Sequence, residues 1–198
     1  MPLLAITLAV TATLAGCAAA DVPATQHSSS HQASASTPKA SPTSTSASGV
    51  IPVDATVVDS DLGDSIHVTG IVRNFPKPDS IKLDGEVILV QITATAGSKY
   101  YAGWSDSSAL LFNGAGKQYN PFDLDSLEAP MTAAGYIPFW VANKNDEIDT
   151  ATTGVSSWVV FIVDDAKGPL SFATRHGAAT TSGGGSIPAG TFKVKISD

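Results

Sequence analysis

The chain has 198 residues, of which 43% are hydrophobic and 15% charged, and 11 basic against 18 acidic side chains give a net charge of −7. An acidic chain without a basic block is poorly suited to binding phosphate backbones, so we expect no nucleic-acid partner. A single cysteine allows neither an internal disulfide nor a thiolate zinc site. All of the 3 Trp, 4 Tyr and 7 Phe residues lie after position 50, which predicts that the core forms only there.

The N-terminus has the pattern of an export signal. Residues 2–16 are uncharged and mostly apolar, but they are too few for the about 20 residues that a spanning helix needs. Cys17 follows directly after Leu14, Ala15 and Gly16, and these four residues resemble the lipobox of bacterial lipoproteins. The resemblance implies that residues 1–16 form a signal peptide and that Cys17 becomes the acylated first residue of the mature protein. The alternative is an ordinary cleaved signal in which the cysteine is incidental.

Residues 17–49 are expected to be a disordered tether. After Cys17 the segment consists mainly of Ser, Thr, Ala and Pro, which cannot bury enough apolar surface to offset the entropy of folding. A flexible coil of this length reaches roughly 30 Å, enough to lift a domain off a membrane surface. His27 and His31 lie in this segment, and we do not expect a disordered pair to bind metal.

The remaining residues, 50–198, alternate between apolar and polar positions in short runs separated by Gly, Pro, Asn and Asp. This period of two predicts strands. Strands are expected over 53–57, 66–72 and 86–95. In the second, Ile66, Val68, Gly70 and Val72 are expected on one face, and in the third, Ile88, Val90, Ile92 and Ala94 are expected to face the core.

Further strands are expected along the rest of the domain. Residues 110–119 form a predicted hairpin, because Asn113-Gly114 favours the positive φ of a tight turn. Residues 135–142 and 191–197 are expected to be strands, with Pro138 marking an edge or a bulge. Residues 158–163 are apolar on both faces and are expected to be a central strand. The one predicted helix covers 125–134 and contains Pro130.

These elements predict an all-β domain. Seven or eight short strands with frequent turn signals are typical of an antiparallel two-sheet sandwich of immunoglobulin type. A barrel is the alternative.

The order of these signals also resembles a known family. The segment 86–96, the hairpin residues Gly116-Lys117-Gln118-Tyr119, and Gly154 leading into 158–163 and Gly168-Pro169 carry the resemblance. They are similar to small secreted immunoglobulin-like domains of bacteria, a group that includes the mycobacterial immunoprotective extracellular antigen and lipoprotein domains of unassigned function. The resemblance implies a surface-displayed binding or interaction module, and it implies no catalytic residue.

Acidic loops are the first candidate for chemistry. Asp59, Asp61 and Asp64 put three carboxylates beside a glycine, and residues 143–149 carry five more oxygen-bearing side chains. Calcium binds six to eight hard oxygens, so both segments are candidate halves of a site, although neither has the spacing of an EF-hand loop. The competing interpretation is solvated turns, and we expect no bound metal or cofactor.

Aromatic residues outside the strand pattern are the second candidate. Tyr100, Tyr101 and Trp104 lie in a Gly/Ser-rich segment, where exposed rings could stack on sugars or anchor a protein partner. Trp140 and Trp158 alternate with apolar neighbours and are expected in the core. A serine hydrolase would need a non-local triad using His67 or His176.

The sequence therefore predicts a lipid-anchored protein on the extracytoplasmic face of the cell membrane. Its domain is expected to be a non-enzymatic binding module for a cell-wall or protein partner. A carbohydrate- or wall-binding module that uses the exposed aromatics is one alternative. A secreted hydrolase with a triad assembled only in the fold is the other.

Overall fold

The computed structural model describes residues 49–100, 102–123, 125–143 and 146–198. The predicted signal peptide and nearly all of the predicted tether, including the lipobox and Cys17, lie outside the described residues.

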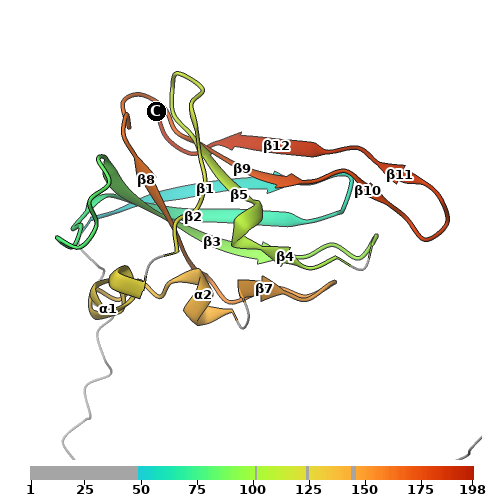
Figure 1. Cartoon of the computed structure of the whole chain (residues 1–198), viewed down its shortest axis with the longest axis horizontal. Helices are drawn as coiled ribbons and strands as arrows, with labels where there is room; N and C mark the ends of the chain where they lie inside the picture. Colours follow the sequence, from blue (N-terminus) through green and yellow to red (C-terminus); the bar gives the residue numbers. More distant parts are fainter. Residues whose placement is uncertain (1–48, 101, 124, 144–145) are drawn as a thin grey trace, which may run out of the picture. The chain divides into compact units, whose positions relative to one another are not determined.

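Two antiparallel four-stranded sheets form the domain (Figure 1). The first has the order β1-β2-β3-β8, with β1 Val50–Val58, β2 Ser65–Phe75, β3 Glu86–Thr95 and β8 Ser157–Val163. The second has the order β12-β9-β5-β6, with β12 Gly190–Lys195, β9 Ser171–His176, β5 Ala109–Phe112 and β6 Gln118–Tyr119. The prediction of an all-β sandwich is confirmed.

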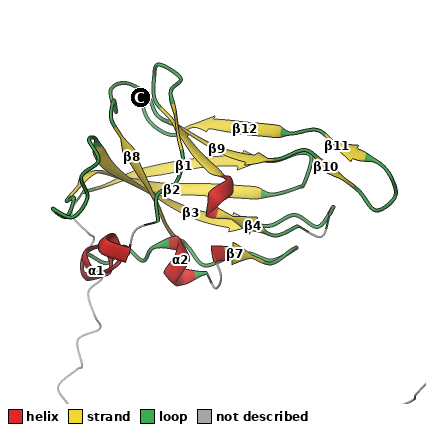
Figure 2. Ribbon diagram, in the orientation of Figure 1, coloured by secondary structure: helices red, strands yellow, loops and turns green. Residues whose placement is uncertain are grey.

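Shorter elements complete the domain (Figure 2). Two ribbons of two-residue strands pair β4 Trp104–Ser105 with β7 Glu147–Ile148, and β10 Ala179–Thr180 with β11 Ser186–Ile187. A 3₁₀ turn, η1 Asp106–Ser108, joins β4 to β5. The helices are α1 Asp125–Ala133, as predicted for 125–134, and α2 Phe139–Ala142.

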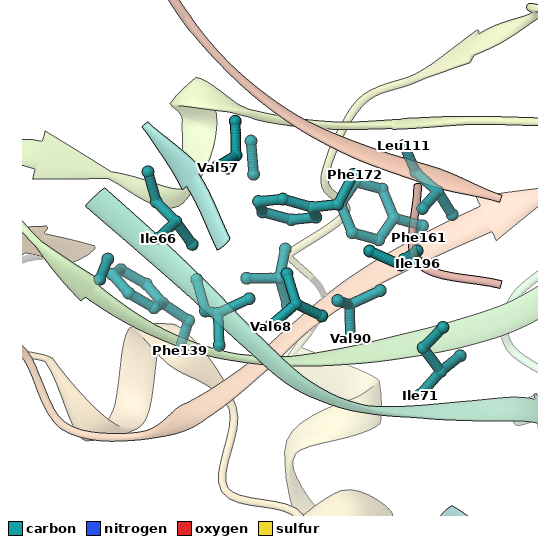
Figure 3. Close-up of a cluster of buried hydrophobic side chains, with 14 of the residues drawn as sticks. Val57, Ile66, Val68, Ile71, Val90, Leu111, Phe139, Phe161, Phe172 and Ile196 are labelled. Atoms are coloured by element: carbon teal, nitrogen blue, oxygen red, sulfur yellow. The ribbon is translucent and has the colours of Figure 1, made fainter. Parts of the chain in front are cut away.

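The main core lies between the two sheets (Figure 3). Val68 and Val90 of the first sheet face Leu111 and Phe172 of the second, and all four are buried. Alternation along β3 is as predicted. Its inward residues Ile88, Val90, Ile92 and Ala94 all belong to this core.

Alternation along β2 differs from the prediction because of a β-bulge. The register shifts between Val68 and Gly70, so Thr69 is an extra residue opposite β3. An extra residue reverses which face the following side chains occupy. Ile71 therefore takes the inward position, whereas Val72 faces outward.

A second apolar cluster covers the outer face of the first sheet. Leu127 and Met131 of α1 pack with Val72, Leu89 and Val160. This layer explains why 158–163 is apolar on both faces. The prediction that this strand is central is wrong, because β8 pairs only with β3 among the strands and stands at the end of the order. The amide of Phe122 and the carbonyl of Ile137 bond to its open edge instead.

The predicted strand over 135–142 is also wrong. Pro138 is extended, with ψ of 153°, and its carbonyl accepts hydrogen bonds from the amides of Val141 and Ala142, which begins α2. Proline lacks an amide hydrogen and fits the start of a helix better than a sheet ladder. In the 110–119 hairpin, the strands are confirmed, but the positive φ falls at Gly116 and not at Asn113-Gly114. The Asn113 side chain instead accepts the amides of Ala115 and Lys117.

Candidate functional site

One end of the sandwich brings together four of the residues predicted as candidates, namely Asp59, Asp61, Tyr100 and His176. The loop 59–64 joins β1 to β2, and Asp59 organises it. Its Oδ1 accepts the amides of Asp61 and Leu62 at 2.8 and 3.0 Å, and its carbonyl accepts the amide of Gly63. Gly63 has φ of +90°, a conformation that favours glycine. Asp59 therefore stabilises this turn through hydrogen bonds to the backbone of the loop.

His176, the last residue of β9, completes this arrangement. Its Nδ1 lies 2.5 Å from Oδ2 of Asp59, and its Nε2 donates to the carbonyl of Pro188 at 2.9 Å. The side chains of His176 and Asp59 are only 8% and 1% exposed. Both ring nitrogens face oxygen acceptors, an arrangement that favours the doubly protonated, cationic ring. Burial alone would lower the pKa of His176, but the hydrogen bonds to Asp59 and Pro188 outweigh it and raise that pKa.

The predicted calcium candidates are only partly brought together. Asp59 and Asp61 lie with His176 so that one ligand atom of each falls within 4.8 Å of the others. One nitrogen and two carboxylate oxygens suit a transition metal better than calcium. An ion would have to replace a proton on His176. Asp64 is not part of this group, and its Oδ1 instead accepts the amide of Gly97 at 2.7 Å. Burial is the main cause of the raised pKa of Asp64.

A polar pocket of about 450 Å³ opens beside this ion pair. Its walls come from the β1–β2 loop, the segment after β3 and the β11 region, and they comprise Ser60, Asp61, Lys99, Tyr100, Ser186, Ile187 and Pro188. Tyr100 is 38% exposed. The ammonium group of Lys99 donates to the carbonyl of Ser60, which ties two of the walls together. An aromatic face, a carboxylate, an ammonium group and hydroxyls are therefore available to one ligand.

The three predicted contact aromatics have different outcomes. Tyr100 lines the pocket, and Tyr101 lies outside the described residues. The prediction that Trp104 is a surface contact is wrong, because this residue is only 1% exposed. Its Nε1 donates to the hydroxyl of Thr174 at 2.9 Å, and its ring packs edge-on against Phe139 at 5.5 Å. The strand pairing of β4 with β7 turns this side chain into the core.

The other two tryptophans and Asn143, from the predicted oxygen-rich segment 143–149, pack in or next to the core. Trp158 is buried as predicted, whereas Trp140 is half-buried. Asn143 is buried, its Oδ1 accepts the amide of Val155, and its Nδ2 donates to Ser157. The amide of Asn143 is therefore used to join α2 to the start of β8.

The residues named for a serine hydrolase do not form a triad in the described part of the chain. Nε2 of His67 bonds to Asp54 at 2.9 Å on an exposed surface. Nε2 of His176 is occupied by the carbonyl of Pro188. No hydrogen bond joins a serine hydroxyl to either ring among the described residues.

The sequence analysis did not single out Asp106 or Asp123, although it included Asp146 in the oxygen-rich segment 143–149. Burial and the charges of Asp123 and Asp146 raise the pKa of Asp106 although the three residues lie in separate segments. No local spacing connects them, so no sequence motif could have indicated the group.

No helix in the described segments is both long and apolar enough to cross a membrane. Comparisons of the chain with protein-family models, with curated proteins and with solved structures found no match.

Proposed function

We propose that this chain is a lipid-anchored extracytoplasmic protein whose β-sandwich is a non-enzymatic binding domain. The lipobox-like residues Leu14 to Cys17 at the end of an apolar run support the anchor. Two acyl chains on Cys17 would hold the protein at the membrane, because each buried CH₂ contributes roughly 0.8 kcal/mol. That the sandwich is of immunoglobulin type is part of the same proposal.

The pocket beside Asp59 and His176 is the observation that carries the binding function. Tyr100 presents an exposed ring next to Asp61 and Lys99, so apolar contact and charge recognition are available together. The Asp59–His176 pair stiffens the loop behind it, which reduces the ordering needed on binding.

A carbohydrate ligand is the second candidate, and one observation favours it. The pocket combines one aromatic face with Ser60, Ser186 and a carboxylate, a set that can stack on a sugar ring and bond its hydroxyls. Because Trp104 is buried, Tyr100 is the one described aromatic residue of this segment whose ring could stack on a sugar.

Photo-crosslinking in intact source cells tests both. A photoreactive phenylalanine analogue replaces Tyr100 in one version of the full chain and Leu83 in a matched control, since Leu83 is 46% exposed on the β2–β3 connection. A protein adduct specific to position 100 supports the binding proposal, and a polysaccharide adduct supports the second candidate. Equal crosslinking at both positions, or none at position 100, refutes a binding role for the pocket.

The anchor is tested separately by intact mass spectrometry of the chain isolated from its native membrane. The expected mass is that of a chain beginning at Cys17 with added acyl groups, and Cys17→Ala should lack them. An unmodified chain, or one that begins elsewhere, contradicts the proposed anchor and leaves the proposed binding role of the pocket unaffected.

A further inference from the structure

The outer face of the second sheet carries three basic side chains on two neighbouring strands. Phe172 of β9 and Val194 of β12 pack in or against the core between the sheets, so the side chains at the intervening positions point outward. Arg175 on β9 and Lys193 and Lys195 on β12 occupy such positions, and all three are exposed. We call these three residues the basic face.

The strand register brings the three cations close together. Thr191 lies opposite Arg175, and Lys193 lies opposite Ala173, with no shift along the pair. Arg175 and Lys193 are therefore diagonal neighbours, and Lys195 is the next outward residue along β12. Diagonal neighbours in a sheet lie within reach of long side chains, so the positive charges repel one another. This group is unfavourable in the sheet unless an opposite charge lies against it.

Only one acidic side chain is recorded against the basic face among the described residues. Lys195 pairs with Asp198, which is exposed beyond the end of β12. Nη2 of Arg175 donates to a backbone carbonyl of η1 at 3.5 Å, and the ammonium group of Lys193 lies 4.7 Å from the centre of the Phe112 ring. Neither contact removes a positive charge, so two of the three cations have no recorded acidic partner.

The basic face is opposite in charge to the chain as a whole. The chain has a net charge of −7 and 11 basic residues, and three of these lie together here. An anionic surface therefore repels the molecule as a whole and attracts this face, which favours one orientation of the domain. The outer face of the first sheet is not available in the same way, because α1 packs over it.

We propose that the basic face is the side of the domain that lies against the anionic lipid headgroups of the membrane. The proposal rests on the lipid anchor of the proposed function, which would keep the domain within reach of the surface. Each Lys or Arg near an anionic bilayer strengthens the contact by about fivefold, so three cations favour this orientation by about a hundredfold. The attraction acts over about one Debye length, about 10 Å at 0.1 M salt, and should be lost at high salt.

Acetylation of the native lysines tests the face without a mutation. The full chain, isolated from its native membrane, is reconstituted in vesicles of phosphatidylcholine alone or mixed with phosphatidylglycerol, and a water-soluble reagent labels it for mass spectrometry. On the mixed vesicles Lys193 and Lys195 should react at least about fivefold more slowly. Lys82, exposed on the β2–β3 connection, is the control in the same sample and should react equally on both. High salt should remove the difference.

Two double variants separate the basic face from net charge. Arg175→Gln with Lys193→Gln should return Lys195 on mixed vesicles to the rate seen on phosphatidylcholine alone. Lys77→Gln with Lys82→Gln changes the net charge equally and should leave Lys195 protected. All four substitutions replace exposed residues, so both variants should fold.

Three outcomes overturn the proposal. They are equal rates for Lys193 and Lys195 on the two kinds of vesicle, as a second copy covering the face would give, protection of Lys195 that persists without Arg175 and Lys193, or protection that is lost in the Lys77→Gln, Lys82→Gln variant. Flotation with phosphatidylcholine vesicles reports the anchor separately. A chain that does not float with them has no anchor, and flotation with the mixed vesicles at low salt then decides whether the basic face binds anionic lipid.

Discussion

Replacing the buried Asp106 by its neutral isostere, as in Asp106→Asn, should stabilise the protein above neutral pH. The pKa of Asp106 is raised from 3.8 to about 7, mainly because its carboxyl is buried. The folded protein therefore holds this proton more tightly than the unfolded chain does. Stability must then fall as the pH rises from about 4 to about 7 and level off above that range.

The magnitude follows from the size of the shift. Each pKa unit corresponds to about 1.4 kcal/mol, so a shift of about three units penalises the ionised folded protein by roughly 4 kcal/mol. Asp106→Asn removes this penalty, because its amide can donate to Asp123 as the protonated acid does. We expect the variant to match the parent chain near pH 4 and to exceed it by up to roughly 4 kcal/mol at pH 8.

Urea unfolding, repeated at each pH from 4 to 8, measures this difference. Asp79→Asn is the control, because Asp79 is exposed on the β2–β3 connection and exposed substitutions usually change stability by no more than about 0.5 kcal/mol. The reasoning is refuted if Asp106→Asn is less stable than the parent chain at pH 8, or if the difference between the two does not grow with pH.

Three further changes test the rest of the structure. Asp59→Asn should cost about 3 kcal/mol below pH 6, because it leaves the buried His176 cation unpaired. This loss should shrink as the pH rises through the raised pKa of His176, which NMR titration of the ring can follow. Trp104→Phe should cost about 2 kcal/mol in urea unfolding through the lost buried hydrogen bond to β9, and an unchanged midpoint would contradict that role. Gly97→Ala should lower stability by about 1–3 kcal/mol, since a Cβ there would lie 2.2 Å from the carbonyl oxygen of Leu62. An unchanged Tm would show that this loop moves freely.

Alternation predicted the buried face of a strand only where the strand is regular. In β3 every second residue from Ile88 to Ala94 faces the core, as expected. In β2 the same reasoning failed after Val68, because a bulge inserts one residue and reverses the faces. A bulge depends on how neighbouring strands pair, and this information is not contained in the strand's own sequence.

Short apolar runs were the other source of error. Residues 158–163 were correctly predicted as a strand buried on both faces, but burial came from α1 and not from a central place in the sheet. Residues 135–142 are equally apolar, and there Pro138 begins a helix. A run of this length is compatible with either structure, and only its tertiary partners decide between them.

Local motifs also predicted only part of the candidate site. The loop of Asp59, Asp61 and Asp64 was visible in the sequence, and Tyr100 was noted as an exposed ring. His176 lies 117 positions from Asp59, so their pairing depends on the approach of β9 to the β1–β2 loop. Asp106, Asp123 and Asp146 are single residues in three segments, and only the fold brings them together.

The two acidic groups of this domain differ in how their buried carboxylates are satisfied. Asp59 accepts two backbone amides and the His176 ring, so all of its strong interactions come from the protein itself. Asp106 is buried beside two further acids, Asp123 and Asp146, and has no basic partner among the recorded ion pairs of the described residues. The first carboxyl is therefore stabilised in its charged form, whereas the second holds its proton more tightly, because burial and the charges of Asp123 and Asp146 disfavour the ionised form of Asp106.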